Sequence, residues 1–303
     1  MVRSDTDSWD LTTSVGVTAT MVAALRALAS EESGPLINDP FAAPLVRAVG
    51  VEFFTRLGEG EIALADLDGQ TRAELQRETD SVAVRTRFFD DFFLEAAHAG
   101  VRQSVILAAG LDTRPYRLAW PLGSVVYEID QPKVVEFKTA TMSALGAAPI
   151  AEHRTVSIDL RGDWPDALCR SGFKVDQLTA WSAEGLLMYL PPDAQDRLFD
   201  NITTLSAPGS LLATEYHPDG GPEMAERASA TSDRWADFGC DANLSELFYH
   251  GERSNVVDYL SQRGWQVSAR TRTELFAEYD RTFADDNAMA PFRNVVAVTA
   301  TLL

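Results

Sequence analysis

Apolar positions recur at helical spacing through the first hundred residues of the chain. Residues 13–29 form an alanine- and leucine-rich run that ends at the turn around Gly34. The segment Asn-Asp-Pro at 38–40 predicts the start of a helix over 41–57, with proline near its first turn. A longer helix is predicted over 71–97, where phenylalanine, valine and alanine form an apolar stripe wide enough to pack against another layer.

From residue 104 onward the pattern changes to short β-like runs that alternate with helical ones. The strands predicted in this part are 104–108, 125–129, 155–158, 178–181 and 210–214. Helices are predicted over 132–144 and 193–205, between strands. Strands that alternate with helices favour a mostly parallel sheet with helices on both faces, which is an α/β, Rossmann-like fold.

The last third of the chain begins with a long segment, 217–250, that has helical stretches and no strand pattern. An insertion of this length in a compact domain is usually a lid or a binding segment. A helix over 254–263 and strands at 265–268 and 294–302 follow, which completes a seven-stranded sheet. We therefore predict a single domain over 1–303, in which a helical cap (1–100) precedes a core (101–303) that carries the lid.

Composition narrows the choice of partners. The 303 residues include 26 basic and 45 acidic side chains, a net charge of −19, and we find no cluster of lysine or arginine. Such a field repels nucleic acid and anionic membrane surfaces, so neither is expected as a partner. No apolar run approaches the ~20 residues that cross a bilayer. The N-terminus does not resemble a signal peptide, and the expected compartment is the cytoplasm.

Cysteine and histidine do not predict a metal site. Cys169 and Cys240 belong to no CxxC pattern and are expected to be buried, reduced thiols. The four histidines are scattered without the spacing of metal ligands.

Candidate chemistry gathers at the end of the first predicted strand. Gly110 lies in the turn after this strand, and Asp130 follows twenty residues later at the end of the second strand. This arrangement is typical of a nucleotide-binding βαβ unit, in which the carboxylate accepts both hydroxyls of a ribose. It is compatible with a dinucleotide or with S-adenosylmethionine. An ordinary tight turn without a ligand also fits this segment alone.

The chemistry of the turn separates the two ligands. A dinucleotide site needs three glycines close to the pyrophosphate, whereas AAGLDT at 108–113 contains one. Asp112 would also place a carboxylate where the pyrophosphate lies. S-adenosylmethionine carries a sulfonium and an ammonium group and no phosphate, so an acidic turn suits it better. Ala109 offers a small side chain, and Gly110 allows the backbone to approach the methionine part of the cofactor.

Several further segments are distinctive when taken together and in order. They are DSWD (7–10) with SVGVTA (14–19), LINDPFA (36–42), RTRFFD (85–90), AGLDTR (109–114), EID (128–130), SIDLR (157–161) and EGLLMYL (184–190). With them the chain resembles, over nearly its whole length, the leucine carboxyl methyltransferase-like family of S-adenosylmethionine-dependent enzymes, and especially its mycobacterial and actinobacterial branch. The resemblance implies a class I methyltransferase fold and S-adenosyl-L-methionine as cofactor.

The resemblance also implies roles for individual residues. Asp130 would hold the ribose hydroxyls, and Asp159 and Leu160 would contact the adenine. Asp159 can instead be a capping or turn residue before Gly162. Glu184 would contact the amino acid portion of the cofactor.

Spacing distinguishes the two arginines of the long predicted helix. Arg85 lies three and four residues before Phe88 and Phe89, so it shares the buried stripe and needs an anionic partner. The carboxylate of the cofactor is the expected one, which matches the use of an arginine from the N-terminal helical region in the family. Arg87 is expected to pair with Asp90 and Asp91 on an exposed face.

Methyl transfer from a sulfonium is an in-line displacement that requires no metal, and no catalytic side chain can be named. A carboxylate acceptor is already ionised at neutral pH, whereas a hydroxyl acceptor needs a base, for which Glu215, Tyr216 and His217 are candidates. The sequence therefore predicts O-methylation of a small molecule or a peptide carboxylate. The alternatives are an NAD-type, dinucleotide-dependent oxidoreductase and a non-catalytic protein that binds S-adenosylmethionine.

Overall fold

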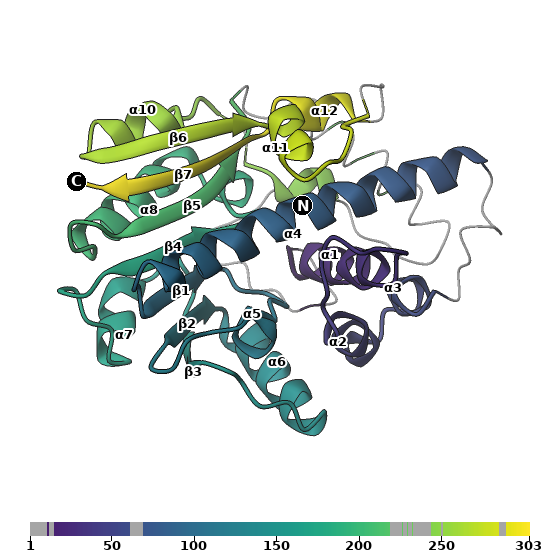
Figure 1. Cartoon of the computed structure of the whole chain (residues 1–303), viewed down its shortest axis with the longest axis horizontal. Helices are drawn as coiled ribbons and strands as arrows, with labels where there is room; N and C mark the ends of the chain where they lie inside the picture. The colour runs from purple at the N-terminus through teal and green to yellow at the C-terminus, as the bar shows by residue number, and fades with distance from the viewer. Residues whose placement is uncertain are drawn as a thin grey trace.

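A seven-stranded sheet forms the centre of the computed structural model (Figure 1). The structure describes residues 11, 15–60, 69–218, 226, 229, 232, 244–249, 251–284 and 289–303. The strands are β1 (Gln103–Leu107), β2 (Val125–Asp130), β3 (Glu152–Ser157), β4 (Thr179–Ala183), β5 (Leu211–Tyr216), β6 (Trp265–Thr271) and β7 (Val296–Leu302). Their order across the sheet is β3-β2-β1-β4-β5-β7-β6.

Strand direction determines which loops meet at one edge. Neighbouring pairs among β1 to β5 are all parallel, and β7 runs antiparallel to both β5 and β6. Because β6 thus runs in the same direction as β5, the carboxyl ends of β1 to β6 all lie at one edge. The prediction of a mostly parallel seven-stranded sheet is confirmed.

Successive side chains along each strand point to opposite faces of the sheet. Val105 and Leu107 of β1 pack with Phe199 in one apolar cluster, beneath α7 (Trp164–Arg170), α8 (Pro192–Thr204) and α10 (Val256–Ser261). Ile106 packs in a second cluster with Phe89 of the long helix α4 (Gly69–His98) and with residues of α11 (Arg272–Glu278). Figure 1 shows α4 crossing in front of the sheet. Helices therefore cover both faces, as predicted.

The helices of the first hundred residues gather beside α4 (Figure 1). They are α1 (Val15–Ser30), α2 (Ala42–Val49) and α3 (Glu52–Gly58). The single helix predicted over 41–57 is wrong, because Gly50 adopts φ +80° and ends α2. Leu45, Phe54 and Val134 of α6 (Pro132–Ala144) share one apolar cluster with Leu111 of the turn after β1. The N-terminal helices thus pack directly onto this turn.

Other elements differ from the prediction mainly at their ends. β6 continues to Thr271, three residues beyond its predicted end. The short helices α5 (Arg114–Arg117) and α12 (Ala290–Arg293), the 3-10 turn η1 (Leu187–Tyr189) and the helices α7 and α11 were not predicted. The 3-10 turn η2 (Leu244–Leu247) lies within 217–250, where helical stretches were expected. Most of the predicted lid, 217–250, lies outside the described residues, as does the 7–10 motif.

Three expectations about composition can be compared with the structure. Cys169 is exposed, so its predicted burial is wrong, and Cys240 lies outside the described residues. Among the described residues, no three histidine, cysteine or acidic side chains are grouped in a way that could hold a metal ion. Within the same ranges, no helix combines the length and apolar character needed to cross a bilayer.

Candidate active site

A cavity of about 370 Å³ lies at the carboxyl edge of the sheet. Residues that follow β1 to β6 form part of its wall, and α1 and α4 contribute the rest together with shorter segments. All seven residues predicted for the site line this one cavity, namely Arg85, Ala109, Gly110, Asp130, Asp159, Leu160 and Glu184. Its volume is in the range of small-molecule sites.

The turn after β1 has an unusual backbone. Ala108 adopts φ +51° and Gly110 φ +49°. A residue with a side chain is rarely found in the left-handed region, and such strain is concentrated at binding and catalytic sites. A Cβ atom added to Gly110 would lie 3.2 Å from the Cβ of Ala19 in α1. Glycine therefore allows the helical cap to close over the turn as well as the ligand to approach it.

Asp130 connects the ends of β1 and β2. One carboxylate oxygen accepts the backbone N–H of Gly110 at 2.6 Å, and the other accepts that of Gln131 at 2.7 Å. Burial raises the pKa of Asp130, although these two hydrogen bonds oppose the shift. Each oxygen keeps a further lone pair, so the carboxylate can still accept hydroxyl donors from a ligand in the cavity.

Asp159 follows β3, where it forms the turn that the sequence left open and also lines the cavity, while its contact with adenine stays a prediction. It accepts the backbone N–H of Arg161 at 2.8 Å, and its own carbonyl accepts that of Gly162 at 2.9 Å, which forms a turn. The side chain of Gln131 also donates to it at 2.8 Å. Burial opposes ionisation, but the hydrogen bonds from Arg161 lower the pKa of Asp159 overall. This turn holds a charged carboxylate at the cavity wall, next to Leu160.

Glu184, directly after β4, lies between two guanidinium groups. Its carboxylate oxygens accept from Arg85 Nε and from an Arg114 terminal nitrogen, each at 2.9 Å. Although burial favours the neutral acid, these cations lower the pKa of Glu184. Gly185 follows with φ +59°, and a Cβ atom there would lie 3.7 Å from a terminal nitrogen of Arg85. That distance is an ordinary van der Waals contact, so it is the positive φ rather than lack of space that favours glycine here.

As their spacing predicts, Arg85 faces the interior and Arg87 lies on an exposed face, but their acidic partners differ from the prediction in two respects. Arg85 lines the cavity, but Glu184 and Glu215 (3.4 Å) already supply anionic partners from the protein. The burial of Arg85 is therefore not by itself evidence that Arg85 binds the carboxylate of the cofactor. Arg87 pairs with Asp91 at 2.9 Å on an exposed face. Asp90, the other expected partner, pairs instead with Arg114 at 2.7 Å, because it faces the turn after β1.

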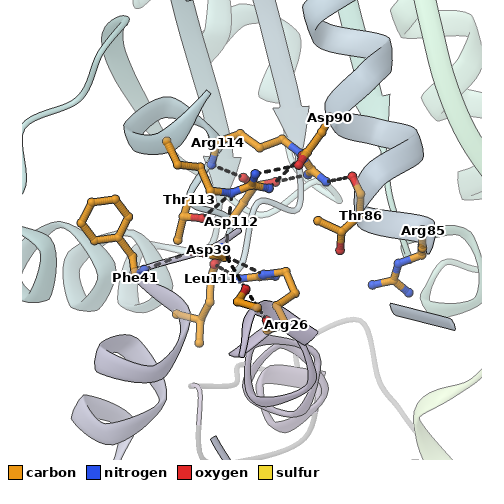
Figure 2. Close-up of polar contacts among 12 residues, drawn as sticks. Arg26, Asp39, Phe41, Arg85, Thr86, Asp90, Leu111, Asp112, Thr113 and Arg114 are labelled. Carbon is orange, nitrogen blue, oxygen red and sulfur yellow. Dashed lines mark hydrogen bonds and ion pairs between the residues drawn. The ribbon is translucent and has the colours of Figure 1, made fainter. Parts of the chain in front are cut away.

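A buried network of charges lies behind the turn (Figure 2). Arg114 contacts Asp90, Asp112 and Glu184, and Figure 2 shows it reaching toward the first two. Arg26 of α1 donates to the carbonyl of Leu111 at 2.6 Å. Sequence reasoning missed Arg114 and treated Asp112 as an uncompensated charge. Because Arg114 compensates the charge of Asp112, repulsion between Asp112 and a pyrophosphate is a weaker argument against a dinucleotide than the sequence suggested. The turn still contains only one of the three glycines that a dinucleotide site needs.

A second arginine, which the sequence did not single out, lies at the other end of the cavity. Arg272 follows β6 and donates from one terminal nitrogen to Ser81 Oγ of α4 at 2.9 Å. Its other terminal nitrogen is 3.6 Å from Glu215. Within the described part of the chain, neither that nitrogen nor Nε has a hydrogen-bond partner. If the strand at 265–268 had been predicted to its observed end at Thr271, Arg272 would have been expected at the carboxyl edge of the sheet.

The candidate bases for a hydroxyl acceptor, Glu215, Tyr216 and His217, also line the cavity. Glu215 contacts both Arg85 and Arg272. Tyr216 donates to Asn255 at 3.5 Å, and burial raises its pKa, so the phenol keeps its proton at neutral pH.

The fold and the cavity define a class of protein. A seven-stranded, mostly parallel sheet with β7 antiparallel, an acidic residue at the end of β2 and a cavity at the carboxyl edge is the arrangement of an α/β methyltransferase. The sequence model of the family described as leucine carboxyl methyltransferase matches residues 19–203, more than half of the chain. The chain belongs to this family and is a methyltransferase.

Two relatives support this assignment, and one solved structure shares the fold. A protein of Mycobacterium avium (strain 104), named "Putative S-adenosyl-L-methionine-dependent methyltransferase", is 68% identical over 100% of both chains. A protein of the same name from Mycobacterium marinum (strain ATCC BAA-535 / M) is 67% identical over 99% of this chain and 98% of its own length.

The solved structure is that of a protein from Thermobifida fusca YX described as a "putative methyltransferase". It aligns with a TM-score of 0.53 at 18% identity and covers 97% of this chain and 96% of its own, which shows the shared fold. The family resemblance read from the motifs is thus confirmed, and the oxidoreductase and non-catalytic alternatives are set aside.

Proposed function

We propose that the chain transfers a methyl group to an oxygen atom of a small-molecule or peptide acceptor, and that this oxygen belongs to a carboxylate rather than a hydroxyl. The observation that carries the proposal is the guanidinium group of Arg272, which lines the cavity after β6 and has no carboxylate within hydrogen-bond distance among the described residues. It attracts an anionic acceptor. Tyr216 keeps its proton and Glu215 is engaged by both arginines, so a nucleophile that is already ionised fits this wall best.

The methyl donor is S-adenosyl-L-methionine, the compound in the names of the mycobacterial relatives. The cavity fits it, since the carboxylate of Asp130, which accepts from two backbone N–H groups, lines the wall and suits a ligand with sulfonium and ammonium charges. The positive φ angles at Ala108 and Gly110 leave the backbone accessible to it. When bound, it supplies an electrophilic methyl group.

We assign the predicted residues to parts of this cofactor by their order along the sheet. Asp159 and Leu160, at the end of β3, would address the adenine, and Asp130 would accept the ribose hydroxyls. Ala109 and Gly110 would lie against the methionine chain. Glu184 and Arg85, tied together at 2.9 Å, would face its ammonium and carboxylate groups.

The remaining contribution of the chain is to hold the reactants together and to exclude water. Ala19, Val22 and Leu25 of α1 and Val82 of α4 supply apolar side chains to the cavity wall. We therefore treat cap and core as one domain over 1–303, with the predicted lid of 217–250 as a further cover. The exclusion of nucleic acid and the cytoplasmic location stay predictions.

The type of acceptor atom can be tested with methyl-labelled S-adenosylmethionine and a small-molecule extract. We expect label in products that release methanol under mild alkali, as methyl esters do. Label recovered on nitrogen or carbon, or the absence of any labelled product, would contradict O-methylation.

The cofactor assignment is tested separately by calorimetry with S-adenosylhomocysteine. Asp130→Ala should weaken binding by about tenfold or more, because a charge-assisted hydrogen bond is lost. Asp176→Ala, which removes an exposed carboxylate elsewhere, is the matched control. Equal affinity of the two variants would show that the ribose assignment is wrong.

A further inference from the structure

Lys138 is a buried cation that the proposed contacts with the cofactor do not use. It lies on α6, its side chain is 3% exposed, and it does not line the cavity. A lysine is rarely buried without a partner, since its ammonium group loses the water that solvates it. In the structure the partners of Lys138 are a carboxylate and a main-chain carbonyl. Each belongs to a segment that contributes to the proposed cofactor site.

The carboxylate is that of Glu128 on β2. One of its oxygens lies 2.8 Å from Lys138 Nζ and 2.8 Å from His153 Nε2. Glu128 is itself buried and precedes Asp130 by two residues, so both side chains lie on the same face of the sheet. The ion pair thus ties α6 to β2 just before the residue that we assign to the ribose.

The carbonyl is that of Asp112, in the turn after β1. Lys138 Nζ donates to it at 3.2 Å. The preceding carbonyl, that of Leu111, accepts from Arg26 of α1 at 2.6 Å. Two successive carbonyls of the turn are therefore held by cations from different helices. Only Arg26 of the two lines the cavity, so Lys138 acts on the turn from outside it.

The charge of Lys138 also affects the carboxylate at the end of β2. Burial raises the pKa of Asp130, and two backbone hydrogen bonds oppose that shift together with the ammonium of Lys138. The charge of Glu128 raises the pKa of Asp130 further. An ionised carboxylate accepts stronger hydrogen bonds than a neutral acid. Lys138 therefore favours the form of Asp130 that is suited to ribose hydroxyls.

We propose that Lys138 is a positioning residue for the cofactor, which holds the turn after β1 and the end of β2 in place and supplies a positive charge behind them. The inference rests on the proposed function, because it concerns segments assigned there to the cofactor. Lys138 lies outside the cavity and acts through the Asp112 carbonyl and through Asp130.

A simpler role for Lys138 is to be only the counter-ion of Glu128. Lys138→Met alone cannot separate the two roles, because it leaves a buried carboxylate uncompensated, which is strongly destabilising. Replacing both residues by neutral side chains removes the pair without leaving a buried charge. The informative comparison is therefore Glu128→Gln against the double variant Glu128→Gln/Lys138→Met. The first keeps the bond from Lys138 to the Asp112 carbonyl, and the second loses it.

The test is calorimetry of the full chain with S-adenosylhomocysteine, after circular dichroism has shown that each variant is folded. Glu128→Gln should bind with an affinity close to that of the wild type. Adding Lys138→Met should weaken binding by about tenfold at pH 7, the usual loss for a hydrogen bond from a charged group. Adding Lys133→Met instead, which removes an exposed lysine of the same helix, is the matched control and should change little.

The dependence on pH separates positioning by charge from a merely structural contact. Without Lys138 the pKa of Asp130 is higher, so on acidification from pH 8 to pH 5 the affinity of the double variant should begin to fall at a higher pH than that of Glu128→Gln. A structural contact would lower the affinity by the same factor at every pH. The other charged and titratable groups around Asp130 and position 128 are identical in the two variants, namely Asp112, Arg114, His153 and Asp159.

Three results would overturn the inference. The first is equal affinity of Glu128→Gln with and without Lys138→Met. The second is a loss in Glu128→Gln alone as large as that in the double variant, and the third is a loss by the same factor at every pH. In each of these cases the wild type still binds S-adenosylhomocysteine and the proposed function stands. If the wild type does not bind it, the proposed function fails and the inference fails with it.

Discussion

Two buried arginines, Arg114 behind the turn after β1 and Arg272 in the cavity wall, differ greatly in the partners that the protein gives them. Arg114, 3% exposed, contacts three carboxylates, those of Asp90, Asp112 and Glu184. Arg272, 5% exposed, has one hydrogen bond to a hydroxyl and a carboxylate 3.6 Å away. Although their burial is similar, the pKa of Arg114 is raised well above its usual value by its acidic partners, whereas burial lowers that of Arg272.

The difference indicates two kinds of charged cluster. Arg114 shares its cluster with α4 through Asp90 and with the turn after β1 through Asp112, so its contacts hold the framework of the site together. Arg272 has donors to spare on the side of the cavity where we place the acceptor. Substitution in a cluster whose charges are all paired should destabilise the protein, whereas a cluster with unpaired donors is suited to binding a ligand. This distinction can be tested by substitution.

The largest effect is expected for Arg114→Met. Removing this guanidinium leaves three buried carboxylates with fewer counter-ions, and breaking a buried ion cluster in this way costs about 3–5 kcal/mol. We expect a loss of this size in the free energy of urea unfolding. A loss below about 1 kcal/mol would show that Arg114 is not a framework residue.

A smaller effect, dependent on pH, is expected for Asp112→Asn. Burial opposes ionisation of Asp112, but Arg114 and Lys138 lower its pKa below the usual 3.8. Because the folded state has the lower pKa, the charge contributes stability above pH 3.8, and this contribution is lost as the pH falls through the folded value. The variant should be less stable than the wild type by about 1–3 kcal/mol at pH 7.

The same comparison at low pH provides the control for Asp112. Urea unfolding should show the difference between the two proteins shrinking as the pH falls below 3.8. A difference that stays constant between pH 7 and pH 3 would mean that the ionised carboxylate is not the stabilising group.

Arg272→Met should change the unfolding free energy by no more than about 1 kcal/mol in either direction. Glu215 keeps Arg85 as a counter-ion, and an apolar side chain of similar length avoids the cost of burying a poorly compensated charge. The measurement is urea unfolding without ligand, beside Arg114→Met. A loss as large as that of Arg114→Met would remove the contrast between the two arginines.

The smallest effect is expected for Arg87→Gln, which removes an exposed pair with Asp91 one helical turn away. Such pairs contribute about 0.3–0.5 kcal/mol, and salt screens them. Unfolding at low and high salt should show a small difference that decreases with salt. A loss above about 1 kcal/mol would place Arg87 in the buried network.

Most of the correct predictions came from residues that lie close together in the sequence. Strand, turn and acidic residue follow one another within about thirty residues, so Gly110 and Asp130 were found from spacing alone. The split of the predicted helix 41–57 at Gly50 was missed, since a single glycine is also tolerated inside helices. Asp90 was assigned to Arg87 because only neighbours along the helix are visible in a sequence, whereas its partners lie 24 and 27 residues away.

By itself, the sequence determined the order of the seven strands, the acidic turn after the first strand and the family, because each depends on residues that are close together in the chain. Only the tertiary structure decided which charges meet. Ser81 and Arg272 are 191 positions apart and come into contact because α4 packs across the sheet near the end of β6. Which arginine pairs with several carboxylates and which keeps donors without partners depends on that packing, since a charge is compensated by its neighbours in space.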